Sequence, residues 1–98
     1  MTRPPGEGAP PPEFKFEIDE AIAQGQYANL AVITNTQQEF ILDFARIVPG
    51  RNPRIVARVI TSPEHAKALL VSLRQNLERF EVQHGPIREL RGGPHQDN

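Results

Sequence analysis

Apolar and charged residues alternate strictly along residues 14–19, where Lys15 and Glu17 separate phenylalanine and isoleucine side chains. Alternation with a period of two is the signal of a half-buried β-strand. The segment is short, follows a run of prolines and carries its charges outward, so it predicts an edge strand. The alternative is an extended arm that pairs with no other strand.

Three further segments, residues 27–34, 39–48 and 54–61, are rich in β-branched and aromatic residues and contain no proline. Four polar residues join the first two, and the Pro-Gly sequence at 49–50 interrupts the chain before the third. Consecutive strands with short connections favour an antiparallel meander. Residues 21–23 are expected to form one helical turn.

A long helix is predicted to begin at Ser62, a preferred N-cap, with Pro63 at the first helical position. It is predicted to end at Gly85, just before a second proline. The pattern therefore predicts an α+β fold, in which an antiparallel meander of three to four strands is followed by one long C-terminal helix packed on the sheet. The apolar stripe of this helix lies within about 100° of arc and comprises Ala66, Leu69, Leu70, Leu73, Leu77 and Phe80.

Both faces of the predicted sheet are apolar. In the strand over 39–48, Phe40 and Phe44 share one face, while Ile41 and Ala45 share the other. A sheet face that meets water should be polar, and one helix covers one face. We therefore expect the other face to meet a second copy of the chain, with a symmetric dimer favoured, or another protein. The alternative is a monomer whose N-terminal arm folds over that face.

The composition supports a partner subunit. The chain has 98 residues, and proline-rich residues 1–12 and polar residues 91–98 are expected to be disordered tails around a single domain over 13–90. Domains of this size commonly need disulfides, a metal or an additional subunit. Cysteine is absent and the three histidines are scattered, which leaves a partner subunit.

The net charge of −1 lacks the basic excess typical of nucleic-acid binding. No apolar run approaches the roughly 18 residues of a membrane span. The first residues lack an apolar signal-peptide segment, so a cytoplasmic location is expected.

Few residues suggest chemistry. Asp43 lies within an apolar strand, where it is either a buried acid with a raised pKa or, the favoured interpretation, a partner of Arg58. His65 could act as a general base, but the nearby Ser62 hydroxyl is better explained as the helix cap. Arginines surround the Pro-Gly loop, and they form either a salt-bridged, solvated surface or an anion or RNA site: Arg46, Arg51, Arg54 and Arg58.

Several linked motifs resemble a known family. They are G-Q-Y-A-N-L at 25–30, E-F-I-L-D-F at 39–44, P-G at 49–50, R-V-I at 58–60, S-P-E-H-A-K at 62–67 and L-R-Q-N-L at 73–77. Together they resemble the small bacterial family known as domain of unknown function 3467, from about residue 18 to residue 87. The resemblance supports one fold and implies no activity. Strands followed by a long helix also resemble the bacterial preprotein-export chaperone in topology, which is weak support for function.

The sequence thus predicts a non-enzymatic, self-associating protein-interaction module without catalytic residues, metal or cofactor. The alternatives are a chaperone-like holdase and a nucleic-acid accessory protein that uses the arginines, although nucleic acid is the less favoured partner. Asn76, on the flank of the helix stripe, either hydrogen-bonds across an interface or faces water. The candidate interface or binding residues are Asn29, Phe40, Asp43, Arg46, Arg58, His65 and Asn76.

Overall fold

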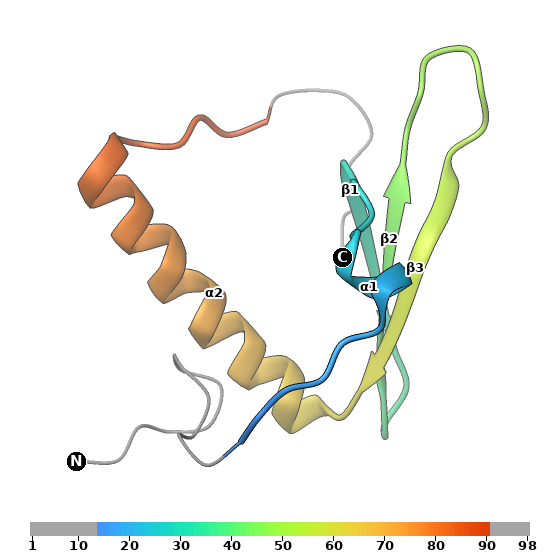
Figure 1. Cartoon of the computed structure of the whole chain (residues 1–98), viewed down its shortest axis with the longest axis horizontal. Coiled ribbons are helices and arrows are strands. Elements are labelled where there is room, and N and C mark those ends of the chain that lie inside the picture. The colour runs from blue at the N-terminus through green and yellow to red at the C-terminus, as the bar shows by residue number, and fades with distance from the viewer. Residues whose placement is uncertain (1–13, 91–98) are drawn as a thin grey trace.

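The computed structural model describes residues 14–90, and the expected tails at 1–12 and 91–98 lie outside this range. A single helical turn, α1 (Glu20–Ala23), precedes the strands β1 (Leu30–Asn35), β2 (Phe40–Arg46) and β3 (Arg54–Thr61) and the helix α2 (Pro63–His84). Figure 1 shows the sheet and the long helix as two separate layers. The predicted α+β fold, with antiparallel strands followed by one long helix, is confirmed.

The three strands form one antiparallel sheet in the order β1-β2-β3. The connection between β2 and β3 contains a turn in which the Arg51 N–H donates to the Val48 carbonyl over 3.1 Å. Gly50 has a φ of 83° there, as the third position of a type II turn after proline requires. The Pro-Gly sequence therefore forms the turn that reverses the chain between β2 and β3, and the predicted antiparallel meander is present.

The helix begins and ends at the predicted residues. The Ser62 hydroxyl accepts a hydrogen bond from the His65 N–H over 3.1 Å, and Pro63 occupies the first turn. The Gly85 N–H donates to the Glu81 carbonyl, and its φ of 92° is a value that favours glycine. Local capping chemistry therefore explains both ends of this 22-residue helix.

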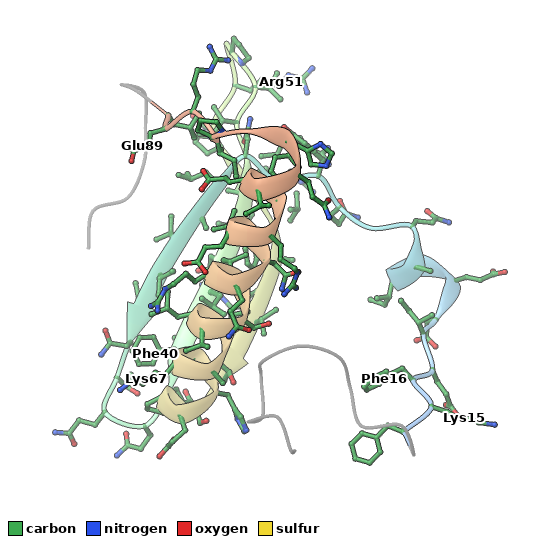
Figure 2. The ribbon with its side chains drawn as sticks, turned by 90° about the vertical axis from the view of Figure 1, so that its left-hand side faces the viewer. Lys15, Phe16, Phe40, Arg51, Lys67 and Glu89 are labelled. Atoms are coloured by element: carbon green, nitrogen blue, oxygen red, sulfur yellow. The ribbon has the colours of Figure 1, made fainter. Side chains whose placement is uncertain are left out.

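The helix was predicted to pack on the sheet, and its packing is looser than that. Figure 1 shows α2 leaving the end of β3 and diverging from the sheet, and Figure 2 shows it in front of one sheet face. None of its residues is buried, and Leu73 remains 52% exposed. Capping and periodicity specify a helix and its apolar stripe, but they do not specify close docking, which depends on the surface that the stripe meets.

The predicted edge strand over 14–19 is wrong, because these residues form no strand and all are exposed. Alternation identifies a segment suited to a half-buried strand, but a strand also needs a neighbouring edge that supplies hydrogen bonds. Within residues 14–90 the sheet has three strands, the lower number of the predicted range. Figure 2 shows the segment that carries Lys15 and Phe16 running away from the sheet. The N-terminal arm, as far as it is described, leaves the sheet faces uncovered.

The core is very small. Across residues 14–90, the buried residues are Leu42, Asp43 and Ala45, all in the central strand β2. A central strand has a neighbouring strand on each side, so its side chains are better shielded from water than those of the edge strands. The remaining apolar residues of the sheet and helix are only partly covered, and the described chain therefore leaves much of its apolar surface exposed to solvent.

Candidate interaction surface

Asp43 and Arg58 are directly opposite each other on β2 and β3. The Arg58 Nε donates to Asp43 Oδ1 over 2.6 Å, and its Nη2 donates to Oδ2 over 2.9 Å. This two-point contact holds the pKa of Asp43 below its ordinary value and raises the pKa of Arg58. The predicted ion pair is confirmed, and a proton-donating acid with a raised pKa is excluded at this position. The pair satisfies a carboxylate on an otherwise apolar sheet.

His65 lies in the first turn of α2, and its Nδ1 is 2.9 Å from the Ser62 hydroxyl oxygen. The same oxygen accepts the His65 backbone N–H. Ser62 is therefore committed to the helix cap, as predicted. The imidazole contacts the oxygen that caps the helix, so both the side chain and the backbone N–H of His65 meet Ser62.

Asn29 and Arg46 tie the segment before β1 to the end of β2. The Asn29 side chain accepts the Ile47 N–H over 2.7 Å and donates to the Ile47 carbonyl over 3.2 Å. Arg46 donates from Nε to the Tyr27 carbonyl over 3.3 Å. The Asn29 backbone N–H also donates to the Ala45 carbonyl over 2.9 Å. Contacts to β2 therefore continue for one residue before β1, which begins at Leu30 rather than at the predicted residue 27. These contacts assign both residues a structural role within one chain.

Phe40 and Asn76 lie on different elements. Phe40 starts β2, opposite Asn35 and Thr61, and is partly buried. Asn76 donates to the Ser72 carbonyl over 2.8 Å and accepts from Arg79 over 2.9 Å, so its amide is used within α2. The structure does not bring the seven candidate residues together as one site, and their role in an interface stays a prediction.

The arginines near the Pro-Gly loop are divided by the structure. Arg46 and Arg54 are opposite each other at the end of the β2–β3 hairpin, and Arg51 lies in the loop between the strands. Figure 2 shows Arg51 at the end of the molecule opposite Phe40. Arg58, farther along β3, is paired with Asp43. The exposed positive charge at the hairpin therefore comes from three arginines rather than four.

The most extensive exposed feature is apolar. Ile33, Ile55, Val59 and Ile60 are exposed on the outer strands. We call the exposed stripe of α2 the helix stripe, and each of its side chains is roughly half exposed: Leu69, Leu70, Leu73, Leu77 and Phe80. Large apolar side chains left exposed in such numbers are typical of an interaction surface.

The N-terminal arm, residues 14–27, adds further exposed apolar side chains that the sequence analysis did not place in a site. Phe16 is 73% exposed, and the other large apolar side chains of the arm are similarly open: Phe14, Ile18, Ile22 and Tyr27. The alternating pattern over 14–19 correctly indicated a segment with an apolar side. Within residues 14–90, no other element covers these side chains.

In residues 14–90 no group of three or more histidine, cysteine, aspartate or glutamate side chains could hold a metal ion. The same residues contain no helix both long and apolar enough to cross a membrane.

Comparison with known proteins agrees with the sequence motifs. The family model described as protein of unknown function (DUF3467) matches residues 1–89, which is most of the chain. Comparisons with curated proteins and with solved structures returned no match. The resemblance noted in the motifs is thereby confirmed, and it extends over the proline-rich residues as well.

Proposed function

We propose that this chain, which belongs to the DUF3467 family of proteins of unknown function, is a non-enzymatic module that associates with a second copy of itself. One observation carries the proposal: the helix stripe and the outer strands keep large apolar side chains open to water. Removing such surface from water is the dominant favourable term in association. A second copy supplies a matching apolar surface wherever the protein is present.

The described part of the monomer offers no other cover for this surface. The helix diverges from the sheet, and the arm over 14–27 is itself exposed (Figure 1). The core of three buried residues in β2 is small for a domain of this length. Association therefore gives the chain the apolar burial that its own fold does not provide. The DUF3467 match is compatible with this role and assigns no activity.

The proposal is tested by co-expressing two differently tagged copies and purifying through one tag. We expect both copies to be recovered together, in similar yield at low salt and at high salt, because apolar contacts are not screened. Recovery of one copy alone would contradict self-association. Recovery that disappears at high salt would contradict the apolar contact as its cause.

A second candidate is a holdase that binds unfolded chains. The exposed phenylalanine and isoleucine side chains of the arm over 14–27 favour it, because they could contact an extended apolar segment. A holdase should suppress the heat-induced aggregation of a client protein in proportion to its concentration. A protein that self-associates and leaves client aggregation unchanged would rule this candidate out.

Nucleic-acid binding through the hairpin arginines is a third and weaker candidate, because Arg58 is neutralised by Asp43. Few aromatic side chains accompany the remaining three, and sequence-tolerant binding to single strands depends on base stacking. Changing Arg51 and Arg54 to alanine should weaken any such binding. Nucleic-acid binding that is equally strong in this variant would rule the candidate out.

A further inference from the structure

Within residues 14–90, nothing guards the outer edge of β1. β1 contacts β2 on one side only, and its six residues include neither a charge nor a proline. Natural sheets usually protect an edge strand with lysine, proline, a bulge or a covering element, because its unpaired backbone groups invite another strand. Figure 2 shows β1 as the outermost strand of the sheet, at the left.

The hydrogen bonding of the β1–β2 hairpin fixes which backbone groups point outward. The Thr36 N–H donates to the Glu39 carbonyl over 2.9 Å, so this pair is of the hydrogen-bonded type. Hydrogen-bonded and non-hydrogen-bonded pairs alternate along an antiparallel ladder. In the observed register, Val32 therefore directs its N–H and C=O to β2, while Ala31 and Ile33 direct theirs away from the sheet. These outward groups are suited to pairing with a further strand.

The opposite edge is different. β3 carries the exposed charge of Arg54, and its pairing with β2 is irregular near Phe44 and Ala45. Charges and bulges are both features that discourage edge pairing. The two edges of this sheet therefore differ in their fitness for a new strand, and β1 is the better suited.

We propose that β1 of one copy pairs antiparallel with β1 of a second copy across a two-fold axis, which joins the two three-stranded sheets into one continuous sheet. This inference rests on the proposed self-association and names its surface. A second copy is the fitting occupant because an uncharged strand can face itself without repulsion. Two-fold pairing is also the commonest symmetry of oligomers.

The joined sheet would place apolar positions of both copies side by side. Ile33, which is 41% exposed, lies next to the junction. A two-fold axis perpendicular to the sheet keeps both α2 helices on the same face. Pairing of the two β1 edges thus sets how the copies are aligned, while the helix stripe supplies apolar surface for burial between them.

The test replaces Ile33 with proline. Proline removes the outward N–H at this position while leaving the β1–β2 hydrogen bonds, and edge strands tolerate proline there. Ile60→Pro is a matched control, because the sequence Val-Ile-Thr surrounds both positions. Val59 and Thr61 are opposite Leu42 and Phe40 and face β2, so the Ile60 amide points to the outer edge of β3.

Sedimentation equilibrium of the full chain measures the effect. We expect the dimer dissociation constant to rise at least about tenfold for Ile33→Pro and to stay within about threefold of the original for Ile60→Pro. Far-UV circular dichroism checks that both variants fold. A larger loss of dimer with Ile60→Pro than with Ile33→Pro would overturn the pairing of β1.

Single cysteine substitutions test the β1 pairing in a second way, which does not require the strand to tolerate proline. The chain contains no cysteine, so Val32→Cys, Ile33→Cys and Ile60→Cys each carry one thiol. A disulfide requires Cα atoms about 4.4–6.8 Å apart, a spacing that directly opposed strand residues provide. With the two-fold axis at the centre of β1, either position 32 or position 33 lies opposite its own copy. Mild oxidation should therefore yield a covalent dimer for one of these two positions and none for position 60.

The outcomes separate the two proposals. A monomeric original protein overturns both self-association and the β1 pairing. A dimeric original protein that Ile33→Pro leaves intact, or that forms no disulfide at position 32 or 33, overturns the β1 pairing alone. If Ile33→Pro fails to fold, the cysteine variants decide.

Discussion

Replacing Leu73 with alanine tests whether the helix stripe takes part in association. Leu73 lies in the middle of the stripe and is 52% exposed in the single chain. Alanine is the best helix former, so the change removes apolar surface without weakening α2 as a helix. The loss should appear in the dimer more than in the folded monomer.

The size of the effect follows from the exposed fraction. Fully burying a leucine side chain contributes about 1.5–3 kcal/mol, so the half of Leu73 that is still exposed corresponds to about 1 kcal/mol when a partner covers it. A symmetric dimer contains Leu73 twice, which makes the loss about 2 kcal/mol. That free energy corresponds to a rise of roughly 30-fold in the dissociation constant.

Sedimentation equilibrium over a concentration series measures this constant for Leu73→Ala and for the neighbouring exposed control Arg74→Ala. Arg74→Ala also shortens a helix side chain, but off the stripe, and should change the constant by less than about threefold. A dissociation constant for Leu73→Ala within about twofold of the original would refute burial of the helix stripe in the dimer.

Three further predictions concern the fold itself. Ser62→Ala removes the hydroxyl that accepts the His65 N–H and should lower the free energy of unfolding by about 1 kcal/mol in urea titration, and an unchanged midpoint would contradict the cap. Gly85→Ala places a side chain at φ 92°, ψ 171° with no neighbouring atom in the way, so backbone strain alone should cost about 1–3 kcal/mol, and an unchanged melting temperature would contradict that strain. Arg58 lowers the pKa of Asp43 in the folded chain, so the stability from their pair is complete above the unfolded pKa of about 4 and declines as the pH falls through the lower folded pKa. Asp43→Asn should therefore lower the melting temperature clearly at pH 7 and much less near pH 2, and an equal loss at both would contradict the pair.

The parts of the fold that short-range chemistry decides were predictable from the sequence. Ser62, Pro63 and Gly85 fix both helix ends through caps that need only neighbouring residues. The Pro-Gly sequence at 49–50 sets the turn between β2 and β3. The Asp43–Arg58 pair was predictable because a lone carboxylate in an apolar strand needs a cationic partner from a neighbouring strand.

The remaining features depend on where distant surfaces lie. The alternation at 14–19 predicted a strand, but no other strand in the described chain pairs with it. The helix stripe was predicted, whereas the divergence of α2 from the sheet was not, because periodicity does not report the distance to a neighbouring layer (Figure 1). β1 starts at Leu30, three residues later than predicted. Just before it, the Asn29 side chain rather than its backbone binds the Ile47 backbone, a contact that strand propensity does not report. The strand pattern likewise did not distinguish the β1 edge from the β3 edge.

The mass of the full chain in solution tests self-association most directly. Light scattering coupled to size-exclusion chromatography, at several loading concentrations and at high salt, reports that mass without reference to shape. The account predicts a mass near twice the 11.0 kDa of a single chain at the higher concentrations. A mass of 11.0 kDa at every concentration, from a protein with cooperative thermal unfolding, would contradict it.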